Sequence, residues 1–139
     1  MKRLGVGLIG SGFMGKAHAL AFRQVAAVFS LPVQIDLEML ADIDDDTAKK
    51  AADAFGFKRS CGDWKKLVSD DQVDIVAITA PNKLHKDIAL AAMENNKIVY
   101  CEKPLAATLA DAQVMTDAAN QSNTITLVGF NYLQNPIIK

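Results

Sequence analysis

Apolar runs of strand length alternate with segments of helical period along the whole of this 139-residue chain. Apolar residues spaced three and four apart predict helices, and the short aliphatic runs between them predict strands. Six strands joined in this way pair in parallel, because each connecting helix crosses the sheet in the right-handed sense. The sequence therefore predicts an α/β fold, a Rossmann-type doubly wound parallel sheet in three layers with strand order 3-2-1-4-5-6.

The expected elements follow from where these patterns begin and end. We expect strands at 4–9, 36–41, 57–61, 73–80, 97–101 and 124–128. We expect helices at 13–29, 44–55, 64–68, 82–95 and 108–121. Asp63 is expected to cap the third helix, Pro81 to fit the first turn of the fourth, and Thr108 to open the fifth with a capping-box pattern.

Composition and charge exclude several classes of protein. Half of the residues are hydrophobic and 22% are charged, which is typical of a folded, water-soluble domain. A net charge of −1 gives no field that attracts nucleic acid or an anionic membrane, and no apolar run reaches the roughly 20 residues of a membrane span. Cys61 and Cys101 lie in or beside apolar runs, so we expect reduced core cysteines in a cytoplasmic protein. No metal site is predicted.

Three glycines stand between the first expected strand and the first expected helix, in the run Gly10-Ser11-Gly12-Phe13-Met14-Gly15. Gly10 would permit a tight turn, Gly12 a close approach of the backbone to a pyrophosphate, and Gly15 close packing of helix on strand. A bound anion would meet unpaired N–H groups and the positive end of the helix dipole. We expect these six residues to bind a dinucleotide; the alternative is a purely structural turn.

Lys16 and His18 follow the glycine-rich run directly. Either side chain has the reach to approach a phosphate. A solvated lysine and a histidine packed against the helix are the interpretations we favour.

Asp42 ends the second expected strand. A carboxylate there accepts hydrogen bonds from the adenosine ribose and repels a 2′-phosphate, and Asp44, Asp45 and Asp46 add negative charge. The expected cofactor is therefore NAD rather than NADP. Asp42 lies 27 residues beyond Gly15, more than the usual spacing of about 20, which the long first helix explains. The alternative is that Asp42 caps the next helix.

Small and polar residues follow the fourth expected strand, namely Thr79, Ala80, Pro81 and Asn82. This strand borders the point at which the strand order reverses, where open parallel sheets bind their ligands. We expect the loop to line the central part of the cofactor. His85 falls one helical turn inside, where contact with the cofactor and a capping or packing role both remain open.

The segment Cys101-Glu102-Lys103-Pro104 at the end of the fifth strand resembles the signature of the Gfo/Idh/MocA oxidoreductases, the glucose–fructose oxidoreductase and inositol dehydrogenase family. The likeness extends over essentially all of the chain. It includes the glycine-rich run, Ala41-Asp42, the 79–82 loop with His85, and Gly129-Phe130-Asn131-Tyr132. Together, the order and spacing of these motifs are more specific than the glycines alone.

The resemblance implies hydride transfer between a nicotinamide cofactor and a hydroxyl-bearing carbon of a sugar, an inositol or a related polyol. Lys103 is implied to be the catalytic lysine, hydrogen-bonded to the reacting oxygen and able to relay its proton. Glu102 is implied to hold the nicotinamide side or to position Lys103, and Asn131 to contact the nicotinamide end. Many relatives have an arginine where this sequence has Leu133-Gln134, so that role is not carried over.

The resemblance also divides the protein. Residues 1–130 are expected to form the NAD(P)-binding domain, and residues 131–139 to begin the link to a C-terminal substrate domain that this sequence lacks. The full-length protein is implied to be a homo-oligomer. Two other functions remain open: a non-catalytic dinucleotide sensor, and a Rossmann reductase acting on an amino-acid or tetrapyrrole substrate. The Glu102–Pro104 turn argues against the sensor, which has no evident need for such a lysine.

Overall fold

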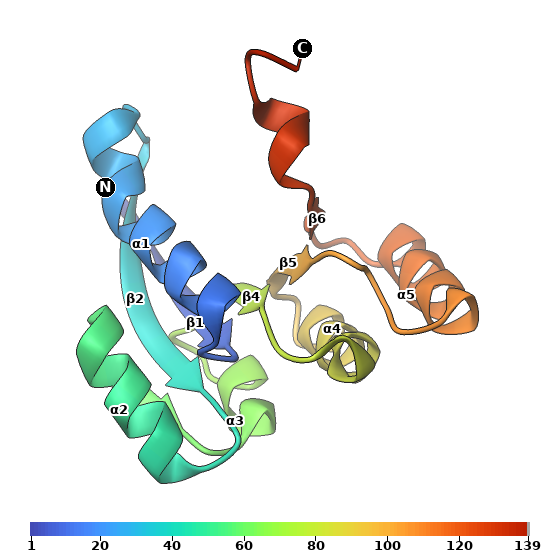
Figure 1. Ribbon diagram of the computed structural model, residues 1–139, viewed down its shortest axis with the longest axis horizontal. Coiled ribbons are helices and arrows are strands. Elements are labelled where there is room, and N and C mark those ends of the chain that lie inside the picture. Colours follow the sequence, from blue (N-terminus) through green and yellow to red (C-terminus); the bar gives the residue numbers. More distant parts are fainter. Residues whose placement is uncertain (139) are drawn as a thin grey trace.

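The computed structural model describes residues 1–138. It is a parallel sheet with helices on both faces (Figure 1). Its strands are β1 Lys2–Ile9, β2 Val33–Ala41, β3 Arg59–Cys61, β4 Ile75–Ile78, β5 Ile98–Glu102 and β6 Thr126–Gly129. They lie in the order β3-β2-β1-β4-β5-β6, and every adjacent pair is parallel. The predicted fold class and strand order are confirmed.

The helices connect successive strands, as the periodicity predicted. They are α1 Phe13–Val28, α2 Asp45–Phe55, α3 Trp64–Val68, α4 His85–Glu94 and α5 Leu109–Gln121, with 3-10 turns η1 Asn82–Leu84 and η2 Asn131–Gln134. The predicted caps are confirmed, because Asp63 accepts a hydrogen bond from the amide of Lys65 and Thr108 accepts one from the amide of Asp111. Each cap satisfies a backbone donor that the helix itself leaves unpaired.

Several predicted elements are shorter in the structure; the third strand, expected at 57–61, is Arg59–Cys61, and the sixth, expected at 124–128, is Thr126–Gly129. Only Ile75–Ile78 of the expected strand 73–80 is regular, and the residues on either side of it also bind the β1 segment through their side chains. Asp74 accepts a hydrogen bond from the amide of Gly5, and the Thr79 hydroxyl donates to the carbonyl of Gly10. The expected helix 82–95 begins as the 3-10 turn η1, and Pro81 precedes it rather than lying inside its first turn.

Apolar side chains fill both sides of the sheet. On the face covered by α1 and α2, a buried cluster includes Leu8, Leu40 and Ala77. On the face covered by α3, α4 and α5, a second cluster includes Ile78 and Ile88. Full burial of one such aliphatic side chain contributes roughly 1.5–3 kcal/mol, so these two clusters hold the helices against the sheet and fix the loops at its edges.

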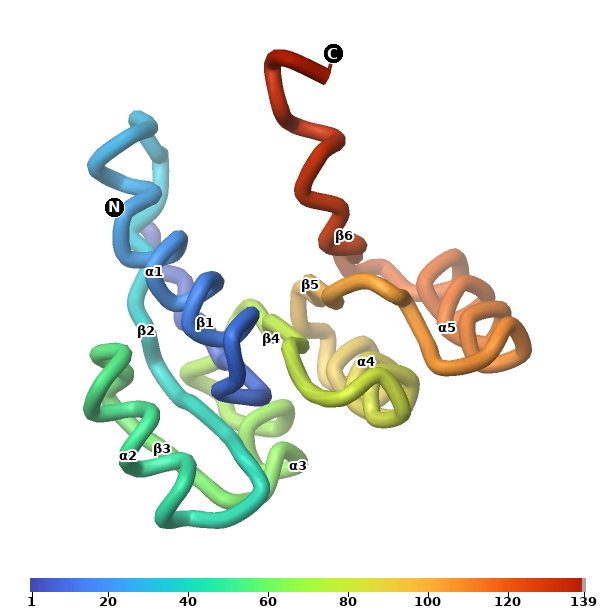
Figure 2. The backbone as a smooth tube through the Cα atoms, viewed as in Figure 1, coloured from blue at the N-terminus to red at the C-terminus, as the bar shows by residue number. Residues whose placement is uncertain are grey.

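One part of the sheet is not covered by a helix within residues 1–138. Beside α1, the face of β4, β5 and β6 borders an apolar groove of about 490 Å³, which we call the α1-side groove; Ile75, Ile98, Tyr100 and Leu127 form its floor. Figure 2 shows the chain after β6 leaving the sheet away from α4 and α5. Residues 131–138, which belong to the expected link to a further domain, lie in this segment after β6, and Lys139 is outside the described residues.

None of the helices within residues 1–138 has the length and apolar character needed to span a membrane.

Candidate active site

The glycine-rich run after β1 forms a tight turn that only glycine permits. Gly10 has a φ of 98°, and a Cβ on it would lie 2.7 Å from the carbonyl oxygen of Thr79. A Cβ on Gly15 would lie 2.1 Å from the carbonyl oxygen of Gly10, so helix and strand approach through the missing side chain. The Thr79 hydroxyl donates to that same carbonyl at 2.7 Å. These contacts fix the direction in which α1 leaves the sheet.

The open side of this turn fits a pyrophosphate. A Cβ built on Gly12 meets no atom within 4 Å, whereas the Cβ positions of Gly10 and Gly15 are blocked. Among the described residues no side chain caps α1, although Asp44, Asp63 and Thr108 cap α2, α3 and α5. The first-turn amides of α1 therefore have no side-chain cap and lie beside open space. This is the arrangement in which a helix N-terminus binds an anion. Phe13 is 87% exposed and Met14 is 36% exposed, so neither side chain fills the space.

Asp42 faces this turn across the end of β2. One of its carboxylate oxygens accepts hydrogen bonds from the Ser11 amide at 2.8 Å and from the Ser11 hydroxyl, and the other accepts from the Ile43 amide at 2.7 Å. An ionised carboxylate offers about four acceptor positions, so capacity remains for a ribose hydroxyl. The Ser11 amide, in contrast, is committed to Asp42. The alternative role of Asp42 as a helix cap is wrong, because Asp44 caps α2 through the Thr47 amide.

The loop after β4 lies against the glycine turn. Thr79 binds the turn directly, and Pro81 and Asn82 are exposed at the rim. His85 is only 1% exposed, with Nε2 2.8 Å from the carbonyl oxygen of Ala80 and Nδ1 3.0 Å from that of Pro104. The buried ring therefore joins the loop after β4 to the turn after β5. The exposed rim of the loop is formed by Pro81 and Asn82 instead.

The turn after β5 presents Lys103 on the surface and Glu102 inside. Lys103 is exposed and precedes a cis peptide bond to Pro104. Glu102 is 7% exposed, accepts a hydrogen bond from the Lys103 amide at 3.0 Å, and lies 2.8 Å from Nε2 of His18. Asn131 follows the end of β6 and is exposed. Since all of these strands are parallel, the two exposed polar residues stand at the same edge of the sheet as the glycine turn.

The predicted site residues thus fall into two groups. The glycine turn, Asp42, the loop after β4, Lys103 and Asn131 are gathered at the carboxyl edge of the sheet, whereas His85 and Glu102 lie buried behind it. The pairing of His18 with Glu102 was missed, since a packed histidine was expected. The available signal was its place one turn after Gly15, on the helix face that packs against the sheet.

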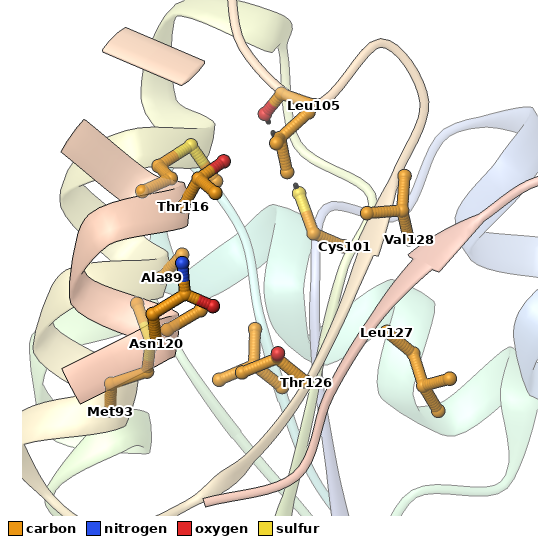
Figure 3. A pocket seen from close by; sticks show the side chains of 12 residues that line it. Ala89, Met93, Cys101, Leu105, Thr116, Asn120, Thr126, Leu127 and Val128 are labelled. Carbon is orange, nitrogen blue, oxygen red and sulfur yellow. Dashed lines mark hydrogen bonds between the residues drawn. The ribbon is translucent and has the colours of Figure 1, made fainter. Parts of the chain in front are cut away.

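A separate cavity on the other face of the sheet does not resemble an active site. It measures about 250 Å³ and lies between α4, α5 and strands β5 and β6 (Figure 3). Cys101 lines it, and burial together with the charge of Glu102 raises the pKa of this thiol to about 12. Such a thiol stays protonated at neutral pH and is a poor nucleophile.

Residues 1–138 hold no cluster of three or more groups able to bind a metal ion.

A family model supports the same assignment of the fold. Residues 4–130 match the model described as an oxidoreductase family with an NAD-binding Rossmann fold. The match therefore includes the glycine-rich run, Asp42, the loop after β4 and the Glu102–Pro104 turn.

Individual proteins are also similar to the chain. It is 42% identical to levoglucosan dehydrogenase of Pseudarthrobacter phenanthrenivorans over 99% of its own length and 36% of that protein's. It is 34% identical to inositol 2-dehydrogenase of Salmonella typhimurium over 94% of its length and 37% of that protein's. A structure of levoglucosan dehydrogenase in complex with NADH and levoglucosan superposes with a TM-score of 0.95 at 40% identity, covering 99% of this chain and 37% of that one. The chain spans little more than a third of the length of these relatives.

Proposed function

The chain belongs to the oxidoreductase family with an NAD-binding Rossmann fold, and from that premise we propose that it is the cofactor-binding part of an NAD-dependent dehydrogenase of sugars, inositols or related polyols. The observation that carries the proposal is the exposure of Lys103 at the same sheet edge as the uncapped N-terminus of α1. Relatives named levoglucosan dehydrogenase and inositol 2-dehydrogenase support the substrate class.

Each group of residues at this edge of the sheet has a role in the proposal. The first-turn amides of α1 hold the pyrophosphate, with Gly12 giving it room. Asp42 accepts a hydrogen bond from the adenosine ribose, so a 2′-phosphate would meet its negative charge. The exposed members of the loop after β4, Pro81 and Asn82, border the middle of the cofactor, and Asn131 its nicotinamide end.

Lys103 acts on the substrate side of the proposed site. When bound, the nicotinamide supplies or accepts the hydride. The Lys103 ammonium donates a hydrogen bond to the reacting substrate oxygen and stabilises the negative charge that develops on it. The Glu102 carboxylate accepts a hydrogen bond from the Lys103 amide, and the buried His85 ring contacts the carbonyl oxygens of Pro104 and Ala80. His85 is therefore proposed as a support for the two loops rather than as a contact of the cofactor.

We propose two further features of the whole protein. The family resemblance supports a homo-oligomer. A cytoplasmic location is supported by the free thiols of Cys61 and Cys101, since disulfides are rare in reducing compartments. A non-catalytic sensor remains the second candidate, and the exposed lysine of the Glu102–Pro104 turn argues against it.

The cofactor assignment is tested by calorimetric titration of the chain with NAD and with NADP. We expect NAD to bind more tightly, and replacement of Asp42 by Ala (Asp42→Ala) to lower NAD affinity about tenfold, as loss of a hydrogen bond to a charged group predicts. Asp71→Ala, at an exposed carboxylate away from the proposed site, is the control for loss of a negative charge. Tighter binding of NADP by the wild-type chain would contradict the role of Asp42.

The catalytic assignment is tested by turnover of sugars and polyols in a protein that contains this chain together with its substrate-binding part. Lys103→Ala is expected to lower kcat at least about a hundredfold, the scale of a general acid–base contribution, while NAD still binds. Lys83→Ala, at an exposed lysine in η1, is the control for loss of a surface charge. Turnover by Lys103→Ala close to that of the wild type would remove Lys103 from the mechanism.

A further inference from the structure

The buried contact between His18 and Glu102 joins the two halves of the site. His18 Nε2 lies 2.8 Å from Glu102 Oε1, although the residues are 84 positions apart. Their side chains are 7% and 9% exposed. A carboxylate removed from water must recover its hydrogen bonds inside the protein, so the contact with His18 governs where this carboxylate can lie.

Three elements converge on the carboxylate of Glu102. His18 from α1 holds Oε1, and the Lys103 amide donates to Oε2 at 3.0 Å. Gly129, the last residue of β6, provides space, because a Cβ there would lie 3.0 Å from Oε1 and 3.1 Å from Cδ of Glu102. The carboxylate therefore fits one position between α1, β5 and β6.

The direction of the Glu102 side chain follows from the pleat of β5. Alternate residues of a strand face the same side of the sheet, so Tyr100 and Glu102 both face α1, and Cys101 faces the opposite cluster. The ring of Tyr100 lies 4.9 Å from that of His18 and holds it from the side. Glu102 thus points toward the helix that carries the pyrophosphate turn.

We propose that His18 is a positioning residue, which fixes the turn bearing Lys103 relative to helix α1 through the Glu102 carboxylate. The proposal rests on the proposed function, because α1 must hold the cofactor for this distance to matter. His18 lies one helical turn after Gly15, and the Lys103 amide binds the other oxygen of the same carboxylate. The pyrophosphate end and the nicotinamide end of the cofactor site are thereby joined by one histidine–carboxylate pair.

Two ligands separate this role from a general effect on folding. ADP-ribose carries the pyrophosphate and the adenosine ribose of NAD but lacks the nicotinamide. Loss of the His18 contact is expected to disturb the Lys103 turn and to leave the glycine turn intact. Calorimetric affinities for both ligands therefore report the two ends of the site separately, without any measurement of turnover.

The test compares the wild-type chain with His18→Leu, His18→Gln and Gly129→Ala. His18→Leu is expected to weaken NAD binding about tenfold, the scale of a lost hydrogen bond to a charged group, and to change ADP-ribose affinity less than about twofold. His18→Gln retains an N–H donor and is expected to restore NAD binding. Gly129→Ala, which displaces the carboxylate without altering His18, is expected to weaken NAD selectively as well.

Phe22→Leu is the matched control. Phe22 lies one turn beyond His18, with ring centroids 6.5 Å apart, so this variant alters packing beside the pair without removing the donor. It is expected to leave the ratio of NAD to ADP-ribose affinity unchanged. If His18→Leu does not fold, Gly129→Ala and His18→Gln still decide the question.

The possible outcomes are distinct. Selective loss of NAD affinity in His18→Leu or Gly129→Ala, with rescue in His18→Gln, supports the positioning role. Equal weakening of both ligands, or unchanged NAD affinity, overturns it and leaves the proposed function intact. A wild-type chain that binds neither ligand contradicts the proposed function, and the positioning role fails with it.

Discussion

The turn after β1 and the turn after β5 lie at the same edge of the sheet but are held in different ways. The first is set by backbone sterics, since side chains at Gly10 or Gly15 would collide with backbone atoms. The second is set by side chains from distant elements, because His18 and His85 hold it from α1 and α4. The first turn depends on side chains that are absent, and the second on side chains that α1 and α4 supply. A substitution in the glycine turn should therefore act by steric collision, and one beneath the lysine turn by loss of a hydrogen bond.

The largest expected effect is that of Gly15→Ala. Its Cβ would lie 2.1 Å from the Gly10 carbonyl oxygen, and neither backbone can yield without separating α1 from β1. We expect the free energy of unfolding to fall by about 3 kcal/mol, the upper part of the range for overpacked cores. Chemical denaturation measures it. A loss below about 0.5 kcal/mol would show that the turn is more adaptable than its geometry implies.

His85→Leu tests the side-chain support of the other turn. The change leaves the carbonyl groups of Ala80 and Pro104 without the ring that joins them. An unsatisfied buried polar group costs about 1–3 kcal/mol, so we expect the free energy of unfolding to fall by about 2 kcal/mol. Denaturation at pH 7 gives the value, with Leu84→Ala as a control for packing at the same helix start. Unchanged stability would mean that the two loops hold their positions without His85.

Gly12→Ala sharpens the contrast within the glycine turn. Nothing lies within 4 Å of the new Cβ, and a φ of −67° suits alanine. Stability should change by less than about 1 kcal/mol, as for an N-cap substitution. NAD affinity should fall about tenfold, because the methyl group enters space that the pyrophosphate requires. Calorimetry and denaturation on the same sample test both parts, and unchanged NAD affinity would contradict the assignment of Gly12.

The smallest expected effect lies at the opposite edge of the sheet, where Arg59 binds Asp70. Hydrogen bonds from Arg59 lower the pKa of Asp70 below its ordinary value of 3.8. The resulting stability is present above pH 3.8 and is lost as the pH falls through the lowered pKa. Because Arg59 is 39% exposed, solvent screens the pair. Asp70→Asn should cost less than about 1 kcal/mol at pH 7, with the difference from wild type shrinking below pH 3.8. A difference that grows on acidification would contradict the sign.

The same contrast explains what the sequence predicts and what it does not. The strands and helices follow from local periodicity, the strand order from right-handed crossovers in a doubly wound sheet, and the glycine turn from three glycines close together in the chain, so the sequence predicted all of them. The partner of Glu102 was not, because it lies 84 positions away and depends on how α1 packs against β5. Asp42 illustrates an intermediate case. Its place at the end of β2 was predictable, whereas its hydrogen bonds to Ser11 depend on the turn opposite.

The most direct test of the central claim is a map of backbone amide shifts in ¹⁵N-labelled chain on addition of NAD. The account predicts the largest changes at the amides of residues 12–16, with further changes at Asp42 and around Lys103. ADP-ribose should reproduce the first set and not the changes around Lys103. Changes confined to the α1-side groove, or no change at saturating NAD, would contradict the claim that the uncapped start of α1 holds the cofactor.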